Sequence, residues 1–165
     1  MNTYSGSQGS GAQIRNIQEL VHDPYFSKRK LPEPSSCPEC GAVYHAGRWL
    51  WGTSSPDAHL SLCPACQRIK DHCPAGVLTL SGDFLSDHRE EILQLLKNLE
   101  QYEKAEHPLK RLICMEHQSD GSLEATFTDP HLARAMGEAV RHAYKGQLDY
   151  DYQAGEYLLR VKWTR

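Results

Sequence analysis

The sequence predicts an α+β fold in which a small cysteine-containing module precedes a two-layer domain of sheet and helices. Two Cys-x-x-Cys pairs lie within residues 36–80, and a leucine-rich segment with helical spacing follows residue 81. The last third of the chain alternates between apolar and polar side chains. A period of two is typical of half-buried strands, and apolar residues three and four positions apart are typical of a helix.

The first 35 residues are predicted to form a flexible arm. Residues 1–12 are mostly Ser, Gly, Gln and Asn, and they bury too little apolar surface to offset the entropy of ordering. Residues 13–24 carry apolar side chains at helical spacing, so we expect a short helix that ends before Pro24.

Residues 25–34 combine two aromatic and three basic side chains, which allows two interpretations. The segment is either a linker on the domain surface, which we favour, or an arm that touches RNA or a protein partner. In the second case the contact residues are Tyr25, Phe26, Lys28, Arg29 and Lys30.

The two cysteine pairs, Cys37 with Cys40 and Cys63 with Cys66, have the spacing of metal ligands. Two intervening residues let both thiolates of a pair reach one ion, and the stretch between the pairs is long enough for a hairpin. Four thiolates form a closed tetrahedral site, so we predict one structural Zn²⁺. An iron–sulfur centre remains an alternative by spacing alone. A redox dithiol does not account for two matched pairs.

The remaining cysteines, Cys73 and Cys114, are expected to be small buried apolar side chains. No Gly-rich phosphate loop, GxSxG or HExxH motif occurs, so no catalytic residue and no small-molecule substrate are expected. The protein is therefore predicted not to be an enzyme.

Between the cysteine pairs, segments 42–44 and 48–51 are predicted to pair as a hairpin around Ala46-Gly47. Trp49 and Trp51 would then share a face, and at least one of them is expected in the small core of the module. A basic and aromatic surface of this kind can stack on bases and pair with phosphates. Its candidate residues are Arg48, Trp49, Arg68 and Lys70.

The part after the second cysteine pair is predicted to alternate between strands and helices. An apolar strand at 76–80 closes a zinc ribbon or treble-clef-like module of residues 36–80, and the α+β domain covers residues 81–165. A helix capped by Ser86 or Asp87 should run to about residue 105, with an apolar stripe on one face.

The remaining elements complete the predicted domain. Asp120-Gly121 suggests a type I′ turn, and Asp129-Pro130 suggests the start of a helix that Gly146 ends. Strands are expected at 109–116, 123–128, 148–152 and 157–163. Together they predict a four-stranded antiparallel sheet with two helices on one face.

Composition limits the kinds of partner. The 165 residues carry a net charge of −3, so any nucleic-acid contact must come from a local patch. No stretch approaches the roughly 20 apolar residues of a membrane span. The N-terminus lacks the pattern of a secretory signal, so a cytoplasmic protein is expected.

The segment Cys37-Pro-x-Cys-Gly, followed by Gly47-Arg48-Trp49, the second knuckle and the leucine-rich helix, resembles a known family. It is similar to the N-terminal zinc-binding region of the nonsense-mediated-decay-protein-3-like family, whose members are adaptors for the large ribosomal subunit. The chain looks like a compact bacterial relative, and it resembles short bacterial zinc-ribbon proteins that share the stretch His22-Asp23-Pro24-Tyr25.

This resemblance implies a non-enzymatic zinc-binding protein that associates with the ribosome, rRNA or other structured RNA as an assembly, quality-control or stress factor. The alternative is a protein–protein adaptor that uses the N-terminal arm and the acidic face of the helix after residue 81. Low net charge favours the adaptor, whereas the zinc module and the basic, aromatic arm favour RNA.

Overall fold

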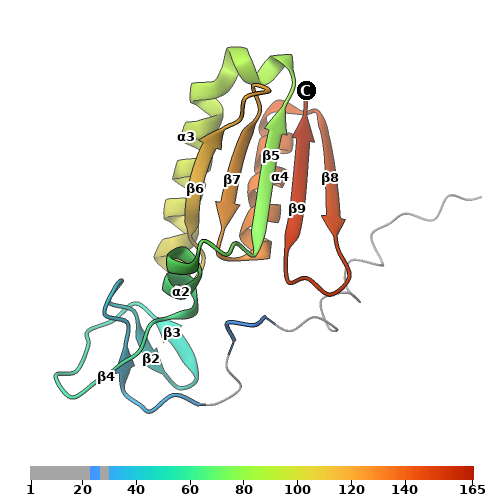
Figure 1. Cartoon of the computed structure of the whole chain (residues 1–165). Helices are drawn as coiled ribbons and strands as arrows, with labels where there is room; N and C mark the ends of the chain where they lie inside the picture. Colours follow the sequence, from blue (N-terminus) through green and yellow to red (C-terminus); the bar gives the residue numbers. More distant parts are fainter. Residues whose placement is uncertain (1–22, 27–29) are drawn as a thin grey trace, which may run out of the picture.

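A computed structural model describes residues 23–26 and 30–165 (Figure 1). Residues 13–22 of the expected helix, and Lys28 and Arg29, lie outside the described residues. The described chain forms two sheets, a small one near the N-terminus and a larger one that carries two long helices. Among the described helices, none is long and apolar enough to cross a bilayer.

The small sheet contains the predicted hairpin and two further short strands. Its order is β3-β2-β1-β4, in which β1 pairs antiparallel with β2 and parallel with β4. Ala46 and Gly47 connect β2 to β3 with φ values of 50° and 79°. The Glu33 carboxylate accepts hydrogen bonds from both of their N–H groups, at 3.0 and 3.3 Å, and so holds this turn. The strands are Ser35–Ser36 (β1), Val43–His45 (β2), Arg48–Leu50 (β3) and His59–Leu60 (β4).

The larger sheet has five strands in the order β6-β7-β5-β9-β8. All neighbours are antiparallel except β5 and β9, which run parallel. The predicted four-stranded antiparallel sheet was therefore wrong. The sequence analysis omitted β5 from this sheet and placed it in the cysteine module. In the structure β5 is the central strand, where Leu78 and Leu80 are fully buried. The strands are Gly76–Ser81 (β5), Leu112–His117 (β6), Leu123–Phe127 (β7), Gln147–Tyr152 (β8) and Leu159–Thr164 (β9).

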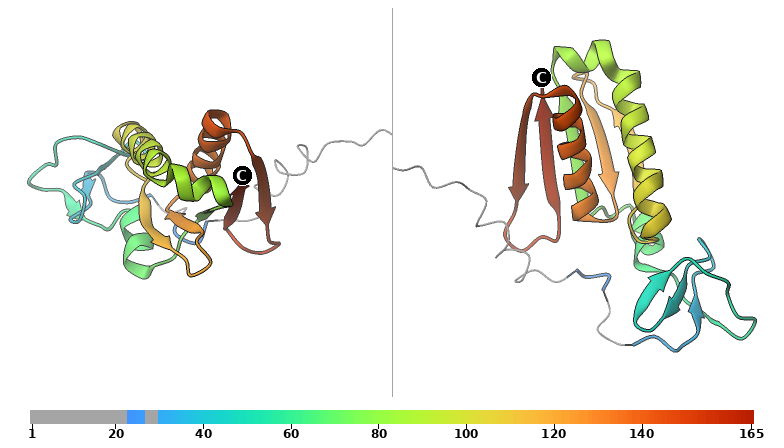
Figure 2. Two further views of the ribbon diagram at one scale, coloured as in Figure 1. Left: turned by 90° about the horizontal axis from the view of Figure 1, so that it is seen from above. Right: turned by 180° about the vertical axis from the view of Figure 1, so that it is seen from behind.

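Both long helices, α3 (Asp83–Glu106) and α4 (Pro130–Tyr144), cover the same face of the larger sheet (Figure 2). The predicted start of α4 is confirmed, because the Asp129 carboxylate accepts the Leu132 N–H at 3.0 Å and Pro130 occupies the first turn. The connection β5–α3–β6 leaves β7 between two parallel strands, which is a split βαβ arrangement.

Helix α3 begins earlier than the predicted caps Ser86 and Asp87. It starts after Gly82, and its backbone is non-helical only at His88, so the expected start coincides with a kink. Gly82 has a φ of 102°, and a Cβ there would lie 2.1 Å from the Arg165 carbonyl oxygen. The Phe84 N–H donates to that same oxygen at 3.1 Å. Tertiary contact with the end of β9 therefore sets the helix start.

The turn after β6 also differs from the prediction. Only Gly121 has a positive φ there, at 85°, so Asp120-Gly121 is not a type I′ turn. Instead the Asp120 carboxylate accepts the N–H of Ser122 at 2.9 Å and its hydroxyl at 2.6 Å. The Asp120 carboxylate therefore closes the loop between β6 and β7.

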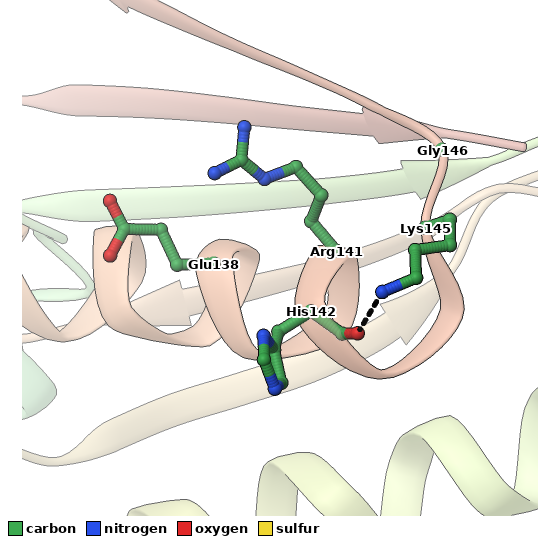
Figure 3. Close-up of a pocket in the computed structure, with 5 residues that line it drawn as sticks. All are labelled: Glu138, Arg141, His142, Lys145 and Gly146. Atoms are coloured by element: carbon green, nitrogen blue, oxygen red, sulfur yellow. Dashed lines mark hydrogen bonds between the residues drawn. The ribbon is translucent and has the colours of Figure 1, made fainter.

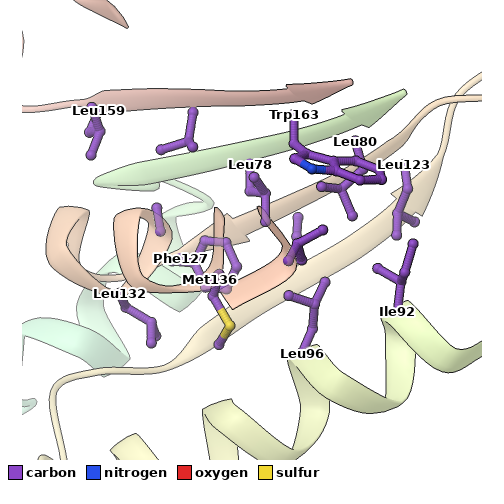
Figure 4. Packing of buried hydrophobic residues seen from close by; sticks show 14 of the residues in the cluster. Leu78, Leu80, Ile92, Leu96, Leu123, Phe127, Leu132, Met136, Leu159 and Trp163 are labelled. Atoms are coloured by element: carbon purple, nitrogen blue, oxygen red, sulfur yellow. The ribbon is translucent and has the colours of Figure 1, made fainter. Parts of the chain in front are cut away.

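One continuous core lies between the larger sheet and its helices (Figure 4). Alternate residues of β5, β7 and β9 point toward the helices, as period-two strands require. The indole N–H of Trp163 is satisfied within this core by the Lys145 carbonyl at 2.6 Å. The labelled side chains are Leu78, Leu80, Ile92, Leu96, Leu123, Phe127, Leu132, Met136, Leu159 and Trp163.

Candidate metal centre

The four predicted ligands meet at one point of the small sheet. The sulfur atoms of Cys37, Cys40, Cys63 and Cys66 all lie within 4.8 Å of one another. The first pair lies in the loop between β1 and β2, and the second pair opens helix α2 (Pro64–Asp71). The sequence analysis did not predict α2. A ligand pair on a helix N-terminus corresponds to the treble-clef-like form of the predicted module.

Local backbone geometry explains why these residues turn their sulfurs inward. Cys63 is the N-cap of α2, where its sulfur accepts the Cys66 N–H at 3.4 Å, and Pro64 fixes the first helical position. The Cys63 N–H in turn donates to the Cys37 sulfur at 3.4 Å. Gly41 has a φ of 77°, and no atom lies within 4 Å of the position that a Cβ would take there. Glycine is therefore needed at this turn for its backbone conformation and not for space.

The donor set fits zinc. Thiolates at zinc–sulfur distances of about 2.3 Å in a tetrahedron are separated by about 3.8 Å. The Cys40 and Cys63 sulfurs are 3.8 Å apart. A cluster of several irons places separate metal atoms beneath different thiolates, so its ligands stand further apart than the 4.8 Å limit found here. Four sulfurs leave no open position for a substrate, so the site is structural.

The electrostatic environment of the sulfurs is uneven. Burial raises the pKa of the Cys63 and Cys66 thiols. Burial also opposes the Cys37 thiolate, but the N–H groups of Cys63, Cys40 and Glu39 outweigh it and lower the pKa of Cys37 to about 7. A divalent cation would stabilise the thiolate forms of Cys63 and Cys66, which burial disfavours.

Arg111 is part of the metal centre, although it precedes β6 in the other sheet. Its Nη2 atom donates to the sulfurs of Cys63 at 3.2 Å and Cys66 at 3.1 Å, and the residue is only 7% exposed. Its main chain is fixed by Thr128, whose hydroxyl accepts the Arg111 N–H at 2.9 Å. Four thiolates around Zn²⁺ carry roughly two excess negative charges. The guanidinium offsets part of that charge through charge-assisted hydrogen bonds.

Sequence reasoning missed Arg111 because nothing local distinguishes it. It looks like one polar position of the strand predicted at 109–116, and its partners are more than forty positions away. The chain around Arg111 carries no knuckle or cap that would indicate proximity to a metal. Only the docking of the two sheets brings it to the sulfurs.

The prediction that Arg68 contacts RNA is wrong. The residue is 1% exposed, and its Nη2 lies 2.5 Å from an Asp23 carboxylate oxygen. Its guanidinium also donates to the Cys73 carbonyl at 3.0 Å and lies 4.3 Å from the centre of the Tyr25 ring. A buried, paired arginine cannot reach a nucleic acid, because helix α2 turns it toward the protein.

The same contacts explain the stretch Asp23-Pro24-Tyr25. Asp23 neutralises Arg68, and the Tyr25 hydroxyl donates to the Asp71 carboxylate at 3.0 Å. Hydrogen bonding to Cys73, followed by burial, raises the pKa of Tyr25. Asp23 and Tyr25 therefore hold this segment against α2.

The other predicted binding residues differ in accessibility. Lys30, Arg48 and Lys70 are exposed, and Phe26 is 69% exposed. Trp49 is half-buried against the metal core and packs on Tyr44 with ring centres 5.5 Å apart. Trp51 is largely outside the core, and its indole N–H donates to the Lys104 carbonyl at 2.6 Å.

The two remaining cysteines are not both buried. Cys73 is exposed, contrary to the prediction, because the left-handed residue His72 ends α2 and turns the chain outward. Cys114 is half-buried on the sheet face opposite the helices, where it accepts a hydrogen bond from the Thr126 hydroxyl at 3.6 Å. Neither belongs to the metal cluster.

A hollow lies at the C-terminal end of α4 (Figure 3). It has a volume of about 520 Å³ and is lined by Glu138, Arg141, His142, Lys145 and Gly146. The Lys145 ammonium donates to the His142 carbonyl at 3.2 Å. Basic side chains at this position complement the partial negative charge of a helix C-terminus, so the cluster has a structural explanation.

The chain is 27% identical over 131 residues to the pre-mRNA-splicing factor SLT11 of Mycosarcoma maydis. The match covers 79% of this chain and 39% of that protein, so the chain spans about two fifths of its length. No protein-family model and no solved structure match the chain.

Proposed function

We propose that this chain is a non-enzymatic, zinc-stabilised protein that associates with RNA, with the ribosome as its target. The observation that carries the proposal is a hairpin that carries the exposed Arg48 and the half-buried Trp49, which packs against the metal centre. Lys30 and Lys70 are further exposed cations in the same part of the sequence. Arginine and aromatic side chains held on a rigid element suit phosphate pairing and base stacking.

The distant relative supports an RNA-related role, because its name assigns it to pre-mRNA splicing. The ribosome as the specific target is inferred from the resemblance to the large-subunit adaptor family. A ribosomal target would place the protein in the cytoplasm. Pre-mRNA as the target would place the protein in a nucleus instead.

Net charge limits the strength of this association. At −3 for the whole chain, attraction to RNA depends on a few local cations. The buried Arg68 and Arg111 are not among them, since both are committed to partners inside the protein. We therefore expect a small number of phosphate contacts and a modest dependence on salt.

The test compares binding of ribosomal RNA and of intact subunits by wild type with two triple variants. Replacing Lys30, Arg48 and Lys70 with Ala should lower the slope of log K against log salt by up to about three. The matched control replaces Lys97, Arg141 and Lys162, which are exposed elsewhere, and should bind as wild type does. Wild type that binds neither RNA nor subunits at low salt would refute the proposal.

The adaptor remains a second candidate, because α3 carries Tyr102, which is 68% exposed, among acidic side chains. Exposed aromatic residues are frequent anchors at protein interfaces. The N-terminal segment supports it less, because Asp23 and Tyr25 already contact α2. Protein capture that resists high salt and is lost in Tyr102→Ala would favour this candidate.

A further inference from the structure

A groove of about 720 Å³ lies where the zinc module meets the end of α3. One wall comes from the N-terminal part of the chain, through Phe26, Tyr44 and Trp49. A second wall is the connection from α3 to β6, through His107 and Leu109. The lower end of α3 stands beside the small sheet (Figure 2), and the hydrogen bond from Trp51 to Lys104 fixes this approach.

The aromatic side chains of this groove differ in what they can offer a ligand. Phe26 is largely exposed and packs against little of the protein. Trp49 packs on Tyr44 at an interplanar angle of 60°, so the pair forms a tilted platform. Each aromatic ring has a face on which a planar group can stack, and stacking on such platforms tolerates any base.

The charges at the groove leave one arginine available to an anionic ligand. The acidic residues are Asp129, which already caps α4, and the exposed Glu106 at the end of α3. Lys110 is paired with Glu103 at 2.9 Å. Arg48 makes no hydrogen bond or ion pair to another side chain in the described part of the chain. The lining of the groove therefore includes an available guanidinium and aromatic side chains, which suit a phosphate and a base.

We propose that this groove binds unpaired nucleotides of RNA, with bases stacked on Phe26 and on the Trp49 platform and Arg48 paired with a phosphate. The inference rests on the proposed association with RNA and names its ligand as single-stranded. Bases in a duplex are stacked on one another, so they cannot enter between two protein walls. Because the lining comes from the zinc module and from the connection after α3, the ligand would contact both parts of the protein.

Aromatic grooves also bind proline-rich peptides. The available Arg48 favours RNA here, because such a peptide supplies no phosphate for it. The experiment therefore includes a peptide as a competing ligand.

The test measures fluorescence anisotropy of a labelled ten-nucleotide single-stranded RNA on the full zinc-loaded chain. Phe26→Ala should weaken binding at least about fivefold, since loss of one stacking partner has that effect or more. Phe26→Trp should retain binding. Tyr102→Ala removes an equally exposed aromatic residue outside the groove and should leave affinity unchanged. An RNA duplex of the same sequence should bind at least about tenfold more weakly.

Three results would overturn the proposal. Affinity for RNA that is unchanged in both Phe26→Ala and Arg48→Ala would place RNA elsewhere and leave the proposed function standing. Binding of a proline-rich peptide that Phe26→Ala abolishes, without RNA binding, would make the groove a protein site. Absence of any RNA binding, single-stranded or ribosomal, would refute the proposed function as well.

Discussion

The guanidinium of Arg111 lies 3.1 Å from the sulfur of Cys66, although 45 positions of sequence separate the two residues. This contact joins the larger sheet to the metal centre of the smaller one. The net charge of the zinc site therefore depends on a residue from the larger sheet as well as on the four cysteines. Burial of a cation and of thiolates is tolerable only because each offsets the other.

Arg111→Met should weaken zinc binding by about 10- to 100-fold, the usual effect of removing a group that supports metal ligands. Competition with a chromophoric chelator measures this constant. Lys110→Met is the matched control, because the neighbouring side chain is partly exposed and pairs with Glu103 and not with sulfur. Equal zinc affinity in the two variants would contradict a role for Arg111 in the metal centre.

Serine at any one of the four ligand positions should abolish stoichiometric zinc. Metal analysis of the purified variants at Cys37, Cys40, Cys63 and Cys66 provides the measurement. Cys73→Ser and Cys114→Ser serve as controls, since both residues lie outside the cluster and should leave one zinc per chain. Loss of zinc in either control would show that the ligand set is misassigned.

Asp23→Asn should destabilise the protein, because it leaves the buried Arg68 guanidinium without its counter-charge. Breaking such a pair costs about 3 kcal/mol or more when both groups are buried, and Asp23 is partly exposed, so we expect somewhat less. Urea denaturation followed by circular dichroism gives the free energy of unfolding. Asp57→Asn, at an exposed loop position, should have no effect. Identical unfolding midpoints would mean that the Asp23 contact is not formed in solution.

Leu96→Ala should lower the free energy of unfolding by about 2–5 kcal/mol, because the side chain is 1% exposed and fills the core. The adjacent Leu95 is only half-buried, so Leu95→Ala should cost less. Chemical denaturation of both variants checks the order. A larger loss at Leu95 would mean that the orientation of α3 is wrong.

Local patterns were sufficient for part of this structure. Asp129-Pro130 predicted the start of α4, and the two cysteine pairs predicted the metal centre, because capping and chelation involve residues close in sequence. The parallel pairing of β5 with β9 had no such signal, since the partners lie about eighty positions apart. An apolar run like 76–80 suits the centre of either sheet.

The candidate site shows the same division. Exposed Arg48 follows from alternation along a hairpin, whereas the burial of Arg68 depends on Asp23 folding back onto α2. Sequence spacing alone does not distinguish a buried arginine from an exposed one. The groove could not be predicted either, because its lining comes from segments that are far apart in the sequence.

The contact between Arg111 and Cys66 also has a consequence for biosynthesis. The four ligands are synthesised before the arginine that supports two of them, and the gap of 45 residues corresponds to roughly 2–9 s of translation. During that interval a metal captured by the nascent chain would be held without its compensating cation. The affinity for zinc should therefore increase late in synthesis, when the larger sheet forms and places the Arg111 guanidinium beside the sulfurs.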